Sequence, residues 1–256
     1  MTDTTVPPSI ATASALSIQL YSLRDRLGDR RAATLAALAA LGYAQVEPYD
    51  ILSDPEQLAR ELAAAGLTAP TAHVKLLDTS VERAIAAART VGVETLIVPW
   101  AEPALFADRA GVTALSERIN LAAARAAEHG LRVGYHNHDF EFSARIDGRP
   151  AWEVLVELLD ERVVLEVDTY WASVGGADVF ELLPRLADRI RAVHVNDEEP
   201  EPDDPPTLGV PVVGRMREVT ALAADIGALV VVEVVVGGDP LPAVERNTRF
   251  FAEALS

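Results

Sequence analysis

The chain has 256 residues, half of them hydrophobic, which is enough for one α/β barrel or for two smaller domains. Its 39 acidic residues outnumber its 22 basic residues, and the net charge of −17 argues against binding to nucleic acids or anionic membranes, because both repel an acidic surface. The sequence contains no cysteine, which excludes disulfides, thiolate metal sites and cysteine nucleophiles.

The first 15 residues are predicted to form a flexible tail. "MTDTTVPPSIATASA" lacks the basic segment and apolar run of a signal peptide. No apolar run approaches the roughly 18 residues that would indicate a membrane span. We therefore expect a cytoplasmic protein in which residues 16–256 form a single folded domain.

From Leu16 onward, short apolar runs alternate with longer amphipathic patterns. Strands are expected at residues 16–22, 44–49, 69–74, 95–100, 131–138, 162–168, 190–197 and 228–236. Helices are expected at residues 31–42, 55–66, 80–91, 108–129, 151–159, 177–187, 214–226 and 241–255. Strands rich in Val, Ile and Leu between amphipathic helices are typical of a buried parallel sheet with right-handed crossovers.

About eight strand–helix units in this length predict an α/β fold of the (β/α)8 TIM-barrel type. An open doubly wound sheet is the alternative. Against it, the sequence has no GxGxxG after the first strand and no GxxxxGK[ST] motif.

Ionisable side chains collect at the expected carboxyl ends of the strands, where a TIM barrel places its chemistry. The ionisable residues are Glu47, His73, His136, His138, Glu166, Asp168, His194 and Glu233, and the polar Asn196 lies among them. Side chains alternate between the two faces of a strand, so His136 and His138 share one face. The same alternation puts Glu166 on the face of Asp168, one layer deeper.

Four of these residues are the predicted ligands of one divalent metal ion: His136, Asp168, His194 and Glu233. Nitrogen and oxygen ligands without sulfur suit Mn²⁺, the expected ion, and also Mg²⁺, Co²⁺ or Zn²⁺. Without a cation, burying two carboxylates together would cost several kcal/mol or keep one of them protonated. Asp168 has an alternative explanation as the N-cap of a following helix, and a strand-end histidine can be a hydrogen-bonded structural residue.

The motifs "GYHNHDFEF", "LEVDTYW", "HVND" and "VVVEV", in that order, resemble the sugar phosphate isomerase/epimerase superfamily of xylose isomerase-like TIM barrels. "IQLYSLRD" and "LGYAQVEPY" resemble its first two strands, so the resemblance spans nearly the whole chain. It implies a divalent ion held by Asp168, His194, Glu233 and the first residue of a Glu-Asn-His motif. Here that motif is His136-Asn137-His138, and the substitution weakens direct transfer of a two-glutamate epimerase mechanism.

The predicted substrate carries no phosphate. The superfamily's seventh strand often ends His-x-Lys-Asp, whereas this chain has Asn196 in place of the lysine. The loop at residues 197–211 is rich in acids and has no basic residue, although the loops after strands seven and eight bind phosphate in many barrels. A sugar, ketose, cyclitol or glycoside is therefore the expected small-molecule substrate.

Each site residue has an expected role. Glu233 is the expected base and also a ligand, while His136 is either the fourth ligand or a catalytic base on the opposite face. His138 is a ligand or a supporting residue behind the ligands. Residues expected to support the site or to line its mouth are Gln19, Tyr21, Glu47, His73, Trp100, Glu166, Trp171 and Asn196, although plain packing explains the lining residues equally well.

Such a site removes the proton next to a carbonyl and forms an enediolate. A metal-dependent isomerase or epimerase is the first hypothesis. A lyase of the same fold, an inosose-type dehydratase or a glycoside-eliminating enzyme, is the second, because a histidine can protonate a leaving group. A third is a catalytically inactive barrel acting as a binding subunit. An abasic-site endonuclease of this fold would need several zinc ions and a basic surface, and homo-oligomerisation is left open.

Overall fold

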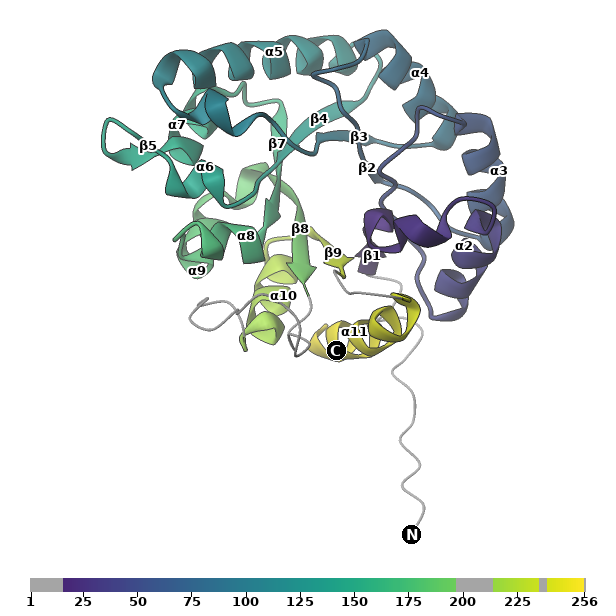
Figure 1. Ribbon diagram of the computed structural model, residues 1–256. Coiled ribbons are helices and arrows are strands. Elements are labelled where there is room, and N and C mark those ends of the chain that lie inside the picture. The colour runs from purple at the N-terminus through teal and green to yellow at the C-terminus, as the bar shows by residue number, and fades with distance from the viewer. Residues whose placement is uncertain (1–15, 197–213, 235–238, 256) are drawn as a thin grey trace.

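The computed structural model describes residues 16–196, 214–234 and 239–255, so the predicted tail and the acidic loop lie outside the described residues. The strands of the main sheet are β1 (Leu16–Ile18), β2 (Thr71–His73), β3 (Thr95–Val98), β4 (Arg132–His136), β7 (Val163–Asp168), β8 (Ile190–Asn196) and β9 (Leu229–Glu233). They are parallel and follow the order β1-β9-β8-β7-β4-β3-β2. Figure 1 shows these strands surrounded by helices.

The segment before β2 closes the gap between the edge strands β1 and β2. Glu47 N donates to Ile18 O at 2.8 Å on the β1 side, and Val46 N donates to Thr68 O at 2.9 Å on the β2 side. The strand expected at residues 44–49 therefore forms isolated parallel bridges instead of a ladder. It still occupies the eighth position of the ring, and the predicted α/β barrel fold is confirmed.

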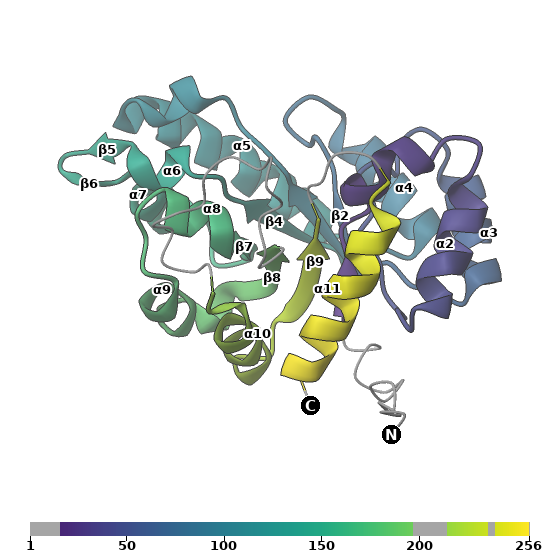
Figure 2. The ribbon, with the colours of Figure 1, turned by 60° about the horizontal axis from the view of Figure 1, so that its bottom comes forward.

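The helices outside the ring correspond to the eight predicted ones. They are α2 (Arg31–Ala40), α3 (Pro55–Ala65), α4 (Val81–Val91), α5 (Arg109–Ala127), α7 (Ala151–Leu158), α9 (Val179–Arg185), α10 (Met216–Asp225) and α11 (Leu241–Ala254). In Figure 2, α11 lies beside β1 and α2, and a 3.0 Å hydrogen bond links Thr248 of α11 with Tyr43 after α2. No helix in the described ranges is long and apolar enough to cross a membrane.

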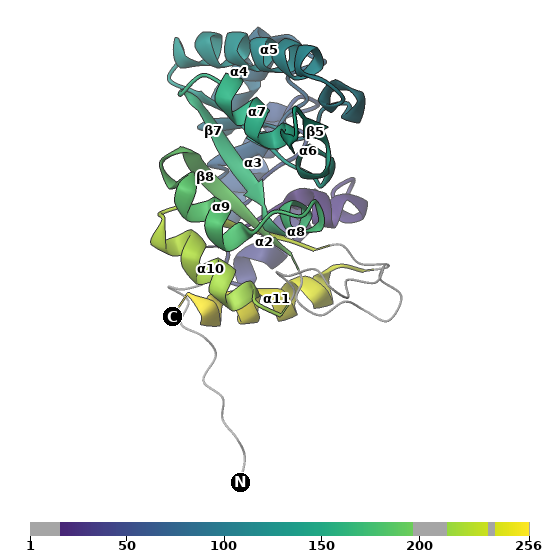
Figure 3. The same cartoon turned by 90° about the vertical axis from the view of Figure 1, so that its left-hand side faces the viewer.

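Several short elements were not predicted. They are α6 (Phe140–Ser143), α8 (Thr169–Val174), the hairpin of β5 (Arg145–Ile146) and β6 (Arg149–Pro150), and the 3₁₀ helices η1 (Leu20–Arg26), η2 (Pro103–Phe106) and η3 (Ala187–Arg189). Figure 3 shows the hairpin beside α6 and α7. All but η3, which lies directly before β8, extend the βα connections at the carboxyl ends of the strands.

Local chemistry sets several helix boundaries. Asp108 Oδ1 accepts a hydrogen bond from Gly111 N at 2.8 Å and caps the start of α5. Gly66 and Gly92 end α3 and α4 with φ angles of 71° and 87°, a left-handed conformation that favours glycine.

The strands present one face to the helices and the other to the barrel axis. On β7, Glu166 and Asp168 alternate with the buried Leu165 and Val167. Glu166 contacts side chains from three other strands, which shows that its face is the interior one. The barrel therefore places ionisable groups along its own axis.

Candidate metal centre

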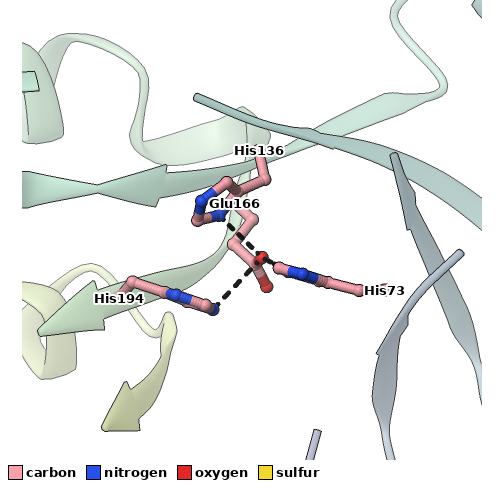
Figure 4. A group of neighbouring side chains, drawn as sticks. All are labelled: His73, His136, Glu166 and His194. Atoms are coloured by element: carbon pink, nitrogen blue, oxygen red, sulfur yellow. Dashed lines mark hydrogen bonds and ion pairs between the residues drawn. The ribbon is translucent and has the colours of Figure 1, made fainter. Parts of the chain in front are cut away.

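Ionisable side chains converge inside the carboxyl end of the barrel and form two groups. The deep group comprises Glu47, His73 and Glu166. The outer group comprises Asp168, His194 and Glu233, and His194 contacts both groups through its two ring nitrogens. Figure 4 shows three imidazoles, those of His73, His136 and His194, pointing at the Glu166 carboxylate.

Glu166 is the centre of the deep group. Its Oε2 lies 2.5 Å from His73 Nε2, 3.1 Å from His136 Nδ1 and 3.2 Å from His194 Nε2. Burial opposes ionisation, but these three imidazoles hold the pKa of Glu166 well below its usual range. The carboxylate is therefore charged and fixed by its neighbours.

Glu47 is the second buried carboxylate of the deep group. Gln19 Nε2 donates to its Oε1 at 2.8 Å, Thr71 Oγ1 donates to its Oε2, and His194 Nε2 lies 2.8 Å from its Oε1. Burial and the nearby charge of Glu166 raise the pKa of Glu47. Glu47 and Gln19, expected at the mouth, are thus buried beneath the outer group.

In the outer group, His194 Nδ1 lies 3.2 Å from Glu233 Oε2. Asp168, His194 and Glu233 each offer one potential ligand atom, and these three atoms lie within 4.8 Å of one another. Asp168 and His194 are fully buried, whereas the Glu233 side chain remains 16 % exposed. Glu233 is therefore the member of the group that a bound molecule can reach.

The two outer carboxylates differ strongly in proton affinity. Burial and the charge of Glu233 raise the pKa of Asp168 to about 7. Burial opposes ionisation of Glu233, but its hydrogen bond with His194 and the charge of that imidazole lower its pKa to about 2. His194 has its pKa raised well above the usual value in spite of burial, because of Glu166, Glu233 and Glu47.

Asp168 combines the two roles that the sequence left open. Its Oδ1 accepts from Trp171 N at 2.9 Å and caps α8, while its buried Oδ2 has no hydrogen-bond partner among the described residues. The Asn137 side chain holds the Asp168 backbone through bonds of 3.0 and 3.1 Å. Oδ1 therefore caps the helix, and Oδ2 is available to a cation or a proton.

The outer group fits a divalent ion. Ligands bonded at about 2.1 Å lie about 3.0–3.4 Å apart around such an ion, and the His194 Nδ1 to Glu233 Oε2 separation is 3.2 Å. The unpartnered Asp168 Oδ2 offers a third ligand. A dication would also offset the cost of two buried carboxylates.

His136, the fourth predicted ligand, falls in a second cluster with His73, Glu166 and His194. Its ring centroid lies 4.7 Å from that of His194, and its Nδ1 bonds to Glu166. Burial lowers the pKa of His136 to about 3, so the ring is neutral, as a metal ligand must be.

His138 lies farther out and is half-buried. Its ring stacks on Phe140 at 5.6 Å and lies 6.2 Å from that of Trp171. Within the described parts of the chain, its buried Nδ1 has no hydrogen-bond partner.

The remaining predicted residues surround the two groups. Asn196 ends β8 and pairs in register with Glu233. Tyr21 and Trp100, which follow β1 and β3, are 48 % and 44 % exposed, and neither belongs to either cluster of potential metal ligands.

Two residues with clear structural roles were not predicted. The Asn137 side chain hydrogen-bonds to the Asp168 backbone, as described above. Glu141 is buried and accepts hydrogen bonds of 2.8 Å from Tyr135 Oη and from His138 N. The sequence signals for these two residues were in "YHNHDFEF", where a polar residue separates two histidines and acids follow them.

A known protein family combines this fold with these motifs. A profile of the xylose isomerase-like TIM barrel family matches residues 35–254. The chain belongs to this family. The resemblance proposed from the sequence motifs is confirmed.

Three solved structures illustrate the fold of the xylose isomerase-like barrel. A sugar phosphate isomerase/epimerase from Parabacteroides distasonis has a TM-score of 0.78 and 21% identity, covering 98% of this chain and 99% of that one. A probable 3-DHS dehydratase from Bacillus anthracis has a TM-score of 0.67 and 14% identity, covering 94% and 98%. The 3-keto-D-glucoside 4-epimerase from E. coli has a TM-score of 0.64 and 15% identity, covering 93% and 98%. At these identities the likeness shows the fold alone, and a search of curated proteins gives no match.

Proposed function

We propose that this xylose isomerase-like barrel is a divalent-metal-dependent isomerase or epimerase. Its substrate would be a non-phosphorylated sugar, ketose or cyclitol, converted through an enediolate. The observation that carries the proposal is the unpartnered Oδ2 of Asp168, buried beside His194 and Glu233 among the described residues at the carboxyl end of the barrel. Isomerases and epimerases with the same fold support it.

One divalent ion would be held by Asp168, His194 and Glu233, with Nε2 of the neutral His136 as fourth ligand. Bound there, the ion would polarise a substrate carbonyl and acidify the adjoining C–H bond. Mn²⁺ is the expected ion, and Mg²⁺, Co²⁺ and Zn²⁺ suit the same donors.

Glu233 is the proposed base. Its low pKa keeps it ionised, and it is the exposed member of the outer group. Asp168, held by its helix cap and by Asn137, stays in place as a ligand. Return of the proton by Glu233 to the neighbouring carbon gives isomerisation, whereas epimerisation requires a second group to protonate the opposite face, the alternative role of His136 in place of ligation.

The proposed absence of phosphate on the substrate rests on charge. The net charge of −17 disfavours an anionic ligand. Asn196, beside Glu233 in the sheet, offers a neutral amide where a lysine would provide a phosphate-binding cation.

A lyase is the second candidate, and His138 is the observation that favours it. Its half-buried ring lies near Trp171 with Nδ1 unpartnered among the described residues, and burial lowers its pKa, so a proton that the ring takes up is readily passed to a leaving group. Position 136 also offers an imidazole in place of a second carboxylate base.

The two candidates differ in the mass of the product. Mn²⁺-loaded protein would be incubated in D2O with ketoses, inososes and glycosides, and products would be followed by mass spectrometry and proton NMR. An isomerase or epimerase adds deuterium and keeps the carbon and oxygen skeleton, whereas a lyase releases water or an alcohol. Neither exchange nor elimination with any of these compounds would contradict both.

Glu233→Gln is the test variant, and Glu94→Gln is its matched control. Glu94 is an exposed carboxylate before β3, at the opposite end of the barrel, and it lies 3.9 Å from Arg191. We expect the exchange to be lost in the first variant and kept in the second.

A further inference from the structure

His194 turns its two ring nitrogens toward two different carboxylate environments. Nδ1 faces Glu233 at 3.2 Å, and Nε2 faces Glu47 at 2.8 Å. A neutral imidazole has one protonated nitrogen, which donates, and one bare nitrogen, which accepts or binds a metal. The group that accepts the hydrogen bond from the protonated ring nitrogen therefore decides which nitrogen of His194 can bind a metal.

Glu47 is a fixed acceptor for that proton. It is fully buried, Gln19 and Thr71 donate to its two oxygens, and its own backbone N donates to Ile18 O. A carboxyl group held in this way cannot turn aside, and because both of its oxygens already receive hydrogen bonds from Gln19 and Thr71, it faces the His194 ring as an acceptor. Its bond with His194 joins residues 147 positions apart in the sequence.

Glu166 is the other acceptor near His194 Nε2, at a longer distance of 3.2 Å. Its Oε2 also interacts with His73 and His136. Glu47 therefore forms the shorter bond to His194, and both carboxylates act on the same nitrogen.

We propose that Glu47 is a positioning residue that keeps the His194 proton on Nε2 and so leaves Nδ1 free to ligate the divalent ion. The inference rests on the proposed metal site at Asp168, His194 and Glu233. Glu47 would touch neither ion nor substrate, but would act through His194 by fixing its tautomer, its ring orientation and its strength as a ligand.

The wild-type protein allows a direct test without a variant. The chain has only five histidines, so selective ¹⁵N-histidine labelling gives a simple ring-nitrogen spectrum of the Zn²⁺-loaded protein. The expected result is a proton on His194 Nε2 and a zinc-shifted, unprotonated Nδ1, assigned by the loss of these signals in His194→Asn. A proton on Nδ1, with zinc on Nε2, would overturn the inference.

Variants of Glu47 test the strength of the effect. Glu47→Gln keeps a neutral acceptor of the same shape, and we expect Zn²⁺ and Mn²⁺ affinity to fall about 10- to 100-fold. Glu47→Leu removes the acceptor and should weaken binding further. Glu141→Gln is the matched control, because Glu141 is an equally buried carboxylate that bonds to Tyr135 and to the His138 backbone and, within the described residues, to no histidine ring. Its metal affinity should stay within about threefold of wild type, in contrast to the loss expected for a residue behind a ligand.

The outcomes separate this inference from the proposed function. If the wild-type protein binds neither Zn²⁺ nor Mn²⁺, the metal centre itself is wrong, and the role of Glu47 is wrong with it. If the ion binds but both Glu47 variants, shown to be folded by circular dichroism, keep wild-type affinity and the wild-type His194 tautomer, only the role of Glu47 is wrong. A lower melting temperature alone would indicate a purely structural role and would count against the inference.

Discussion

The deep group and the outer group are built from the same residue types but differ in how far the protein satisfies them. In the deep group, both oxygens of Glu47 accept hydrogen bonds and three imidazoles surround one oxygen of Glu166. In and around the outer group, polar atoms of Asp168, Asn196 and His138 are buried without a partner among the described residues.

This difference separates a supporting layer from a binding layer. Buried polar atoms are nearly always paired, and exceptions often mark an unseen ion or a catalytic role. The deep group is close to complete as protein alone, although Glu166 Oε1 has no partner in the described part of the chain. A cation would supply the partners that the outer group lacks, so a metal should act on the outer group and leave the deep group unchanged.

Replacing Glu233 by glutamine should have the largest effect. The variant loses both a ligand and the proposed base, so we expect kcat/KM to fall by at least about 1,000-fold. Metal affinity, measured by titration with Mn²⁺, should fall as well. A variant with wild-type turnover would contradict the assignment of Glu233, and Glu94→Gln serves as the control.

Replacing Asp168 by asparagine should abolish tight metal binding but stabilise the metal-free protein. The folded-state pKa of Asp168, about 7, lies above its ordinary value of 3.8, so ionisation of this group costs stability as pH rises between those values. Asparagine keeps an oxygen to cap α8 and removes the charge. We expect the melting temperature of the metal-free variant to exceed that of the metal-free wild-type protein by an amount that grows from about pH 4 to about pH 7 and then levels off. A destabilised variant at pH 8 would contradict this burial cost.

Metal affinity should rise with pH. In the metal-free protein Asp168 is protonated below about pH 7, and the raised pKa of His194 keeps a proton on both ring nitrogens. Binding must displace these protons, so affinity should increase at least about tenfold per pH unit below pH 7. Calorimetry in two buffers of different ionisation enthalpy would measure the released protons. A pH-independent affinity would place the ion elsewhere.

Replacing His138 by asparagine should have the smallest effect of these changes. The ring lies outside both groups, so we expect metal affinity within about threefold of wild type and turnover reduced about tenfold or more, as for loss of a proton-transferring group. Loss of metal binding instead would make His138 a ligand.

The sequence predicted which residues of one strand face the barrel axis and that Glu166 lies deeper than Asp168, but not the relative depth of residues on different strands. Alternation along β7 correctly placed Glu166 and Asp168 on one interior face. The depth of Glu47 and His73 depends on the register between neighbouring segments, as in the parallel bridge of Glu47 with Gln19 and the pairing of His73 with Ile97. No local pattern reports such a register, so Glu47 was expected at the mouth.

Local signals for the unpredicted hairpin were present in the sequence. Asp147 and Gly148 form its turn with φ angles of 52° and 80°, and an Asp-Gly pair is typical of a tight hairpin. Each strand has only two residues, too few to show alternation. The double hydrogen bond from Asn137 to Asp168 joins neighbouring strands and could not be read from either strand alone.

The most direct measurement is a crystal structure of the Mn²⁺-soaked protein with an anomalous difference map. We expect one strong peak bonded to Asp168 Oδ2, His194 Nδ1 and Glu233, with the Glu47 and His73 side chains unmoved. A peak inside the deep group, between His73 and Glu166, or no peak at all would contradict the assignment of the outer group as the metal centre.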